Sequence, residues 1–385
     1  MNEIEKLIQE LCPDGVEYRR LGEVCEIKPG KDYKHLSEGD IPVYGSGGIM
    51  TYVNKYVYDK PTVLLPRKGS ISNVFYVDTP FWNVDTIYYT IIDTNVILPR
   101  YFYFIILNEH IEKYNTSNAA RPALTRAVLD KIEIPLPPIT IQEKIVEILD
   151  KFTSLEAELE AELEARRKQY EYYREKLFTF SPDDENVRWA TLGEIGTFVK
   201  GSGIQKSDFV ENGYPCIHYG QLHTYYGTFT KHNKSFISKA LFDKCKKAQN
   251  GDLIIATTSE DVEACCKATA WLGDSEVAVS GDAHIYHHNQ NPKYITYFFQ
   301  TELFSKQKRK HASGVKVVRV SSDNLSKISI PLPPLSEQRR IVAILDRFEA
   351  LTNDLQAGLP AEIAARRQQY EYYREKLLTF KRKTV

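Results

Sequence analysis

One short cationic segment has the composition of a binding site for an anionic ligand. Pro66-Arg-Lys-Gly-Ser70 follows an apolar run and combines the cations Arg67 and Lys68 with a glycine and the Ser70 hydroxyl. Cationic side chains, hydroxyls and free backbone amides bind phosphate groups or the edge of a guanine base. A solvated turn explains the same residues equally well. Gly45-Ser-Gly-Gly48 also has two interpretations, because its glycines could bring a backbone close to a ligand or form only a flexible turn.

A longer cationic segment lies in the second half of the chain. It contains no aspartate or glutamate and carries Lys306, Lys308, Arg309, Lys310, Lys316 and Arg319. Arg121 and Arg126 occupy a comparable place in the first half, next to Asn118-Ala-Ala. Two differing loops at equivalent places favour a contact role over two accidental surface loops. We therefore expect both to contact a polyanion.

No motif in the sequence predicts catalysis. The chain lacks a glycine-rich phosphate loop ending in Gly-Lys-Ser/Thr, an Asp/Asn-Pro-Pro-aromatic motif for amino methylation, and a paired-histidine zinc helix. His284-Ile-Tyr-His-His288 could suggest a metal, but its spacing favours strand or surface histidines over ligands. Asp85 and Asp282 occupy similar places in the two halves, and we interpret both as structural. The sequence predicts no catalytic and no metal-binding residue.

The elements that must position these residues are encoded twice. The repeated segments are Leu21-Gly-Glu-Val24 with Leu192-Gly-Glu-Ile195, Ile134-Pro-Leu-Pro-Pro138 with Ile330-Pro-Leu-Pro-Pro334, and Gln169-Tyr-Glu-Tyr-Tyr-Arg-Glu-Lys-Leu177 with the identical residues 369–377. An opening signal, a divergent body, a proline-rich hinge and a helix thus follow one another twice, which indicates a tandem of two modules.

Both bodies are predicted to be mixed α/β, with a short amphipathic helix at 2–11 before the first. We expect strands at 62–65, 74–77, 86–92, 253–257 and 284–287, and helices at 101–114 and 293–308. The helices after the hinges each carry one apolar stripe, so we predict that they pair as an antiparallel coiled coil. Gly358 and Pro360 should break the second helix. The predicted regions are the first body (1–135), first helix (136–180), second body (181–331), and second helix with tail (332–385).

Composition indicates a globular protein. The 385 residues are 42% apolar and 12% aromatic, which is enough for real cores. We find neither an apolar run of membrane-spanning length nor a signal-peptide pattern. The six cysteines show no paired metal spacing, and we expect them to be reduced. These features predict a soluble, cytoplasmic protein.

The doubled order of body, Leu-Pro-Pro hinge, Ile-Leu-Asp helix and Tyr-Glu-Tyr-Tyr-Arg-Glu-Lys-Leu ending resembles the specificity subunit of Type I restriction-modification systems. The resemblance covers essentially the whole chain. Gly358-Leu-Pro-Ala-Glu362, leading into Ala365-Arg-Arg367, is also similar to that family's second helical region. The first helix departs from it with Glu160-Ala-Glu-Leu-Glu164 at this place. The departure puts the length of the spacer in question.

The resemblance implies a non-catalytic subunit whose two target recognition domains each read one half of a bipartite, asymmetric site in double-stranded DNA. The helices would set the gap and dock two modification subunits, which bring S-adenosylmethionine, while restriction subunits cleave with ATP and magnesium. No cofactor is then expected in this chain. The DNA contacts would come from Arg67, Lys68, Ser70, Arg121, Arg126, Lys306, Lys308, Arg309, Lys310, Lys316 and Arg319. Partner contacts would come from the repeated helix ends, at Tyr170, Tyr172, Tyr173, Arg174, Tyr370, Tyr372, Tyr373 and Arg374.

Two functions of other classes are compatible with parts of the pattern. A self-sufficient DNA-modifying enzyme would methylate DNA without partners, although the motifs for that chemistry are missing. A coiled-coil scaffold with sugar- or protein-binding ends would bind no DNA.

Overall fold

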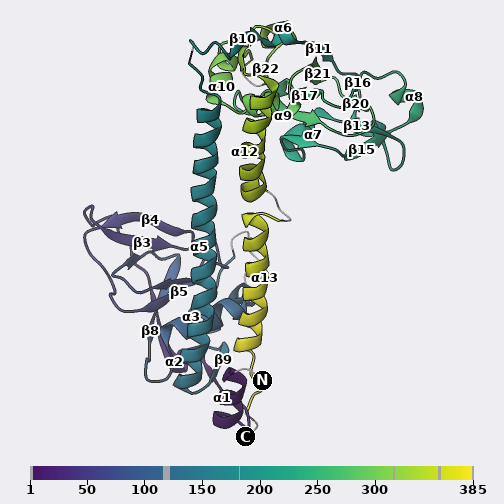
Figure 1. Ribbon diagram of the computed structural model, residues 1–385. Coiled ribbons are helices and arrows are strands. Elements are labelled where there is room, and N and C mark those ends of the chain that lie inside the picture. Colours follow the sequence, from purple (N-terminus) through teal and green to yellow (C-terminus); the bar gives the residue numbers. More distant parts are fainter. Residues whose placement is uncertain (1–2, 116–121, 182, 315–316, 354–356, 384–385) are drawn as a thin grey trace. The chain divides into compact units, whose positions relative to one another are not determined.

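The chain forms two compact units, which the computed structural model describes over residues 3–115, 122–181, 183–314, 317–353 and 357–383 (Figure 1). The first unit combines residues 1–160 with 362–385, and the second contains residues 161–361. Each unit holds one body together with parts of both helical regions. Both bodies are mixed α/β, as predicted, and the two units are described separately.

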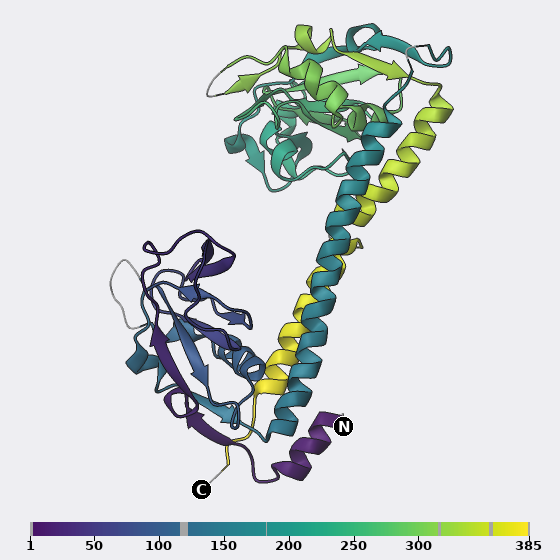
Figure 2. The same ribbon diagram turned by 90° about the vertical axis from the view of Figure 1, so that its left-hand side faces the viewer.

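The first unit begins at helix α1, and both ends of the chain lie in it (Figures 1 and 2). The elements up to the long helix are α1 (Glu3–Leu11), β1 (Glu17–Arg20), α2 (Leu21–Val24), β2 (Cys25–Pro29), β3 (Ile41–Gly45), β4 (Gly48–Val53), β5 (Thr62–Pro66), β6 (Phe75–Val77), β7 (Trp82–Asn83), β8 (Ile87–Ile92), α3 (Pro99–Glu109), the 3-10 turn η1 (Ile111–Tyr114), α4 (Arg126–Leu129), β9 (Glu133–Leu136) and α5 (Ile139–Leu177). One core joins the sheet, α3 and the start of α5, where Leu65, Phe104 and Ile145 are fully buried. Burial of each such side chain contributes about 1.5–3 kcal/mol.

The second body lies within the second unit. Its elements, with the helices that follow, are β10 (Arg188–Thr191), α6 (Leu192–Ile195), β11 (Gly196–Lys200), η2 (Lys206–Asp208), β12 (Phe209–Val210), β13 (Tyr214–Ile217), α7 (Tyr219–Thr224), β14 (Phe229–Thr230), β15 (Ser235–Ile237), α8 (Lys239–Phe242), β16 (Lys247–Ala248), β17 (Leu253–Ala256), β18 (Thr258–Ser259), β19 (Lys267–Trp271), β20 (Val277–Val279), β21 (Ala283–His288), α9 (Pro292–Phe298), α10 (Glu302–Arg309), β22 (Val318–Arg319), α11 (Ser322–Leu325), β23 (Ser329–Leu332), α12 (Leu335–Asn353) and α13 (Leu359–Leu378).

The two bodies share a central sheet although their sequences diverge. Strands β2, β8, β5 and β6 form a sheet in that order in the first body, and β11, β21, β17 and β19 have the same order and antiparallel pairing in the second. A glycine follows the first strand of each central sheet, because Gly30 comes directly after β2 and Gly201 directly after β11. A Cβ there would lie 2.0 Å from the Val84 carbonyl oxygen or 2.2 Å from that of Ser280, so a side chain would displace the loop before β8 or β21.

The remaining strands differ between the bodies. The first body adds a three-stranded sheet in the order β4-β3-β7, whereas the second adds β14 to its central sheet and a five-stranded sheet in the order β12-β15-β13-β20-β16. These additions account for the divergent sequence between otherwise equivalent elements.

The proline-rich run is a strand as well as the predicted hinge. In the first unit β1 pairs antiparallel with β9, and in the second β10 pairs with β23. Prolines fit because a two-stranded ribbon leaves part of each strand's N–H groups unpaired. The hydroxyl of Tyr101 donates to the carbonyl of Pro135 (3.2 Å) and that of Tyr294 to Pro331 (2.7 Å), which ties the body's helix to the run.

An equivalent glutamine fixes each body to the helix that follows it. Gln142 accepts a hydrogen bond from the amide of Leu98 (2.9 Å) and donates to a carbonyl of its own hinge (2.9 Å). Gln338 does the same with the amide of Asn291 (3.1 Å) and its hinge carbonyl (2.9 Å). Both side chains are buried, and losing either would leave buried backbone groups without partners. The direction in which each helix leaves its body is therefore set.

The helices pair antiparallel within each unit, as predicted. The start of α5 packs against the end of α13 in the first unit, where the rings of Phe152 and Tyr373 stack at 5.5 Å. The end of α5 packs against the start of α12 in the second, where Tyr173 and Phe348 stack at the same distance. The break between α12 and α13 falls beside Gly358, as predicted. No helix within the described ranges is long and apolar enough to span a membrane.

The helix predicted at 293–308 is two helices, α9 and α10. The hydroxyl oxygen of Thr301 accepts the amide of Phe304 and so starts a new helix, and Thr301 is itself fully buried. A buried N-cap of this kind satisfies amides that a continuous helix would have bonded internally. The apolar periodicity continues across the break, so the pattern alone could not reveal it.

Candidate nucleic-acid interface

Two predicted segments meet in the first body. The loop after β5 lies beside the segment before α4, where the amide of Leu124 donates to the carbonyl of Arg67 (2.8 Å) and Lys68 forms a β-bridge with Ala123. We term residues 67–69 and 122–124 the first loop pair. Both segments were candidates for ligand contact in the sequence, the first of them equally well explained as a solvated turn, and the fold places them next to each other.

The side chains of the first loop pair face the loop before β8. Lys68 Nζ lies 2.6 Å from Asp85 Oδ2, and the Arg67 guanidinium donates to the Asp85 carbonyl (3.2 Å). The hydrogen bond from Lys68 holds the pKa of Asp85 below its usual range. Lys68, Ser70 and Asp85 are exposed. Because an exposed ion pair contributes little stability, a phosphate or base edge can take the place of Asp85 at low cost.

The turn between β3 and β4 lies beside the first loop pair, where a Cβ on Gly69 would lie 3.0 Å from Ser46 Oγ. The amide of Ser46 donates to Thr86 Oγ1 (3.1 Å), and Asn73 donates to the Ser46 carbonyl (3.0 Å). A Cβ on Gly47 or Gly48 would meet no heavy atom within 4 Å. The tip of this turn is bare backbone that points into open space, as a close approach to a ligand requires.

The second body repeats this pairing of two loop segments with different residues. The amide of Val320 donates to the carbonyl of Thr257 (3.2 Å), and Thr258 pairs with Arg319. We term residues 257–259 and 318–320 the second loop pair. The structural counterpart of Lys68 is Thr258, and that of Arg319 is Ala123. The cationic side chain therefore lies on opposite members of the two loop pairs.

An open cavity of about 380 Å³ lies beside the second loop pair, with Lys200, Asp282, His284 and the exposed Arg319 in its lining. The Thr257 hydroxyl lies 3.1 Å from His284 Nδ1. Burial, followed by the charge of Lys200, lowers the pKa of His284. A neutral imidazole, a carboxylate and two cations provide both donors and acceptors, which suits recognition of base edges as well as phosphates.

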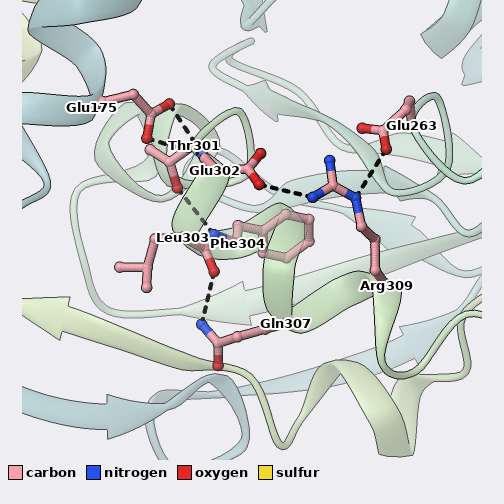
Figure 3. A network of polar contacts seen from close by, with 8 residues as sticks. All are labelled: Glu175, Glu263, Thr301, Glu302, Leu303, Phe304, Gln307 and Arg309. Carbon is pink, nitrogen blue, oxygen red and sulfur yellow. Dashed lines mark hydrogen bonds and ion pairs between the residues drawn. The ribbon is translucent and has the colours of Figure 1, made fainter.

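The basic segment that begins at Lys306 is not one continuous cationic surface, because its described cations lie in different surroundings. Arg309 lies on α10, and its guanidinium bonds to Glu302 (2.8 Å) and Glu263 (3.0 Å), as Figure 3 shows. The carboxylate of Glu175, near the end of α5, accepts the amide of Glu302 (3.0 Å). Helix α10 is thus docked on α5, and two carboxylates neutralise its arginine.

Lys308 does not meet the requirements of a DNA contact, and that prediction is corrected. It is 2% exposed, and its ammonium donates to the carbonyls of Glu263 (2.9 Å) and Cys265 (3.0 Å). Its position four residues after Phe304 places it on the buried face of α10. Composition gives the number of cations in a segment and not the depth of each one, so Lys308 was predicted to be a surface charge together with its neighbours.

The other predicted cations stay predictions. Lys306 and Lys310 are exposed. Arg126 is exposed on α4, 3.3 Å from Asp130. Arg121 and Lys316 lie outside the described residues.

Half of the predicted partner-binding residues are used in helix packing. Tyr170, Tyr173, Tyr370 and Tyr373 pack against the phenylalanines of the opposing helices. The guanidiniums of Arg174 and Arg374 lie 5.2 Å and 5.4 Å from the ring centroids of Tyr170 and Tyr370. Tyr172 and Tyr372 are 60% and 61% exposed. Those two tyrosines remain the best candidates for contact with a partner.

Metal-ligating clusters are absent from the part of the chain that the structure describes, where no group of three or more His, Cys, Asp or Glu could hold an ion. His287 instead contacts Asp252 (2.8 Å), and His288 is largely buried. Lys200, Thr258 and His284 are interface candidates that no sequence pattern predicted. The available signal was the equivalence of Asp85 and Asp282, which we interpreted as structural.

Comparisons with known proteins agree with this arrangement. A family model for the Type I restriction modification DNA specificity domain matches residues 13–165 and again 185–365. The putative type I restriction enzyme specificity subunit S.HindORF215P of Haemophilus influenzae is 32% identical over 98% of this chain and 98% of its own. The EcoR124I/EcoR124II specificity subunit of Escherichia coli is 32% identical over 99% of this chain and 97% of its own.

Two solved structures share the fold. The crystal structure of the Type-I restriction-modification system S subunit from M. genitalium has a TM-score of 0.58 at 17% identity and covers 94% of this chain and 96% of its own. A chain from a study of complex assembly and conformational transition of the type I R-M system has a TM-score of 0.63 at 16% identity, covering 94% and 97%. Since the family model matches both modules and the curated relatives align over nearly the whole length, this chain belongs to the Type I restriction-modification specificity subunits, which recognise DNA and are not themselves catalytic.

Proposed function

We propose that the first body reads one half of a bipartite DNA site and the second body reads the other half. The observation that carries this proposal is the shared frame of the two loop pairs. Both have the same backbone pairing next to an exposed aspartate, yet the cation is Lys68 in one and Arg319 in the other. The same backbone pairing fits the regular shape of a double helix in both bodies, and the different side chains fit two different base sequences.

The proposed regions are a first target recognition domain at 1–135, a first spacer helix at 136–180, a second target recognition domain at 181–331, and a second spacer helix with the tail at 332–385. The proposed partners are double-stranded DNA, two modification subunits and the restriction subunits, in the cytoplasm. S-adenosylmethionine would bind to the modification subunits, and ATP and magnesium to the restriction subunits. Exposed Tyr172 and Tyr372 support docking of the same partner at both helix ends.

Modified-base sequencing tests the proposal. DNA from cells that carry this chain with its modification partner should contain methylated adenine in a two-part motif. Replacing Arg67 and Lys68 together with Ala should relax the sequence preference in one half only, and Arg319→Ala should relax the other half only.

Three outcomes would contradict the proposal. The two variants could alter the same half, which would exclude one body per half-site. Methylation of DNA by the purified chain alone would indicate a self-sufficient enzyme. The absence of DNA binding by the bodies at every salt concentration measured would indicate a scaffold.

A further inference from the structure

The β3–β4 hairpin of the first body exposes apolar side chains next to a polar surface. Ile49, Met50 and Tyr52 are 50%, 57% and 51% exposed. A β-bulge lies within this stretch, because the register passes from Thr51 opposite Val43 to Ile49 opposite Tyr44 and leaves Met50 without a partner in β3. A bulge of this kind redirects side chains that a regular strand would alternate between its two faces.

Met50 is held in place. A Cβ on Gly45 would lie 2.7 Å from Met50 Sδ, so the thioether lies across the bare backbone of Gly45. The turn that follows is tied down by the hydrogen bonds of Ser46 to Thr86 and Asn73. The backbone next to Met50 therefore has a fixed position, with little backbone freedom to lose on binding.

Duplex DNA suits this surface better than a protein partner does. Thr86 connects the hairpin to the first loop pair, because its hydroxyl accepts the amide of Ser46 and its carbonyl accepts the amides of Arg67 (3.0 Å) and Lys68 (3.3 Å). The side chains of Arg67 and Lys68 complement a polyanion. The major groove of B-DNA admits a two-stranded β-ribbon, whereas the minor groove is about half as wide. The apolar group that bases present in the major groove is the C5-methyl of thymine.

We infer that the hairpin enters the major groove of the first half-site and that Met50 selects thymine through its methyl group. This inference rests on the proposed function, because it assigns part of the specificity of the first body. It adds a readout that the charged residues cannot supply, since cations and carboxylates do not distinguish thymine from uracil.

A base-analogue cycle tests the inference. The methyltransferase assembled from this chain and its modification subunits is titrated with duplexes in which each thymine of the first half-site is replaced in turn by deoxyuridine, which removes only the methyl. One replacement should lower the affinity about fourfold, the ratio for one buried methyl group. Met50→Ala should bind the two duplexes alike. Ile91→Ala, which truncates a 36% exposed apolar residue on β8, is the matched control and should retain the ratio.

Each other outcome has a distinct meaning. Equal affinity of the unchanged complex for every deoxyuridine duplex overturns the inference, as does full discrimination by Met50→Ala. A Met50→Ala variant that loses only its modification subunits would show that the hairpin binds protein, which also overturns it. Failure of the proposed function differs from all of these, because the unchanged complex would then show no preference for the two-part sequence.

Discussion

Arg319 and Arg309 carry the same charge, yet we predict that removing Arg319 weakens DNA binding and that removing Arg309 leaves its salt dependence unchanged. Arg319 is exposed on the second loop pair and lines the adjacent cavity. The Arg309 guanidinium is bonded to Glu302 and Glu263, and its hydrogen bond lowers the pKa of Glu302. Arg319 is a cation at the DNA surface whether it reads a base or binds a phosphate, and removing one cation there reduces the slope of log Kobs against log salt by about 0.9. Between about 50 and 200 mM salt, this corresponds to a change in salt sensitivity of about 3.5-fold.

The assay is a fluorescence-anisotropy titration of a labelled duplex with the assembled methyltransferase across this salt range. Arg319→Ala should bind about tenfold more weakly at low salt, and its deficit should shrink about 3.5-fold at the highest salt. Arg309→Ala should retain the slope of the unchanged complex, because two carboxylates bind its guanidinium and a phosphate would have to displace both, whereas Lys68 is paired with one. A reduced slope for Arg309→Ala combined with an unchanged affinity for Arg319→Ala would refute the assignment of the two arginines.

Three further predictions follow from equivalent or buried residues. Gly30→Ala and Gly201→Ala should each disturb one loop before β8 or β21 by steric overlap, and modified-base sequencing should show loss of preference in a different half-site for each. Burial lowers the pKa of His288 to about 4, whereas an unfolded histidine titrates near 6.5. The unfolded state then binds more protons at this residue. The stability contributed by neutral His288 should therefore be fully present above about pH 6.5 and fall by about 3 kcal/mol as the pH approaches 4. Urea unfolding of His288→Phe should show a smaller loss over that range. Phe152→Ala and Phe348→Ala remove matching aromatic stacks, and each should lower the free energy of unfolding of its own unit by about 2–3 kcal/mol, measured by circular dichroism in urea; a change in only one unit would contradict the equivalence.

Local patterns in the sequence predicted much of the fold. The repeated helix ends revealed two modules, and the strands β5, β8, β17 and β21 were predicted within a few residues of their observed bounds. Those features depend on neighbouring residues, which a single sequence displays. The shared order of the two central sheets depends on pairing between distant segments with unrelated side chains. No pattern in one sequence encodes that pairing directly.

The site was only partly predictable, for a related reason. Composition identified the segments that form the first loop pair and, through Arg319, the second. It could not separate exposed Arg319 from buried Lys308, because residue type and spacing do not report depth in a folded body. Lys200 and His284 lie far from Arg319 in sequence, and the fold alone brings them to one cavity.

The identical helix ends have two possible causes, and the structure separates them. Tyr173 and Tyr373 stack on Phe348 and Phe152 with the same geometry, so internal packing is enough to keep that part of the repeat the same. Tyr172 and Tyr372 are 60% and 61% exposed, and helix packing requires neither of them. An exposed aromatic ring suits a protein interface, where it provides a large contact area.

Truncation of the exposed tyrosines therefore tests docking separately from stability. Tyr172→Ala and Tyr372→Ala should each weaken assembly with modification subunits by about tenfold or more, the effect of losing one strong aromatic contact. Urea unfolding of the chain alone should change little, because both rings are exposed. Analytical ultracentrifugation of the chain with increasing modification subunit measures the assembly. Undiminished assembly of both variants would leave the internal stacks as a sufficient explanation of why the two helix ends are the same.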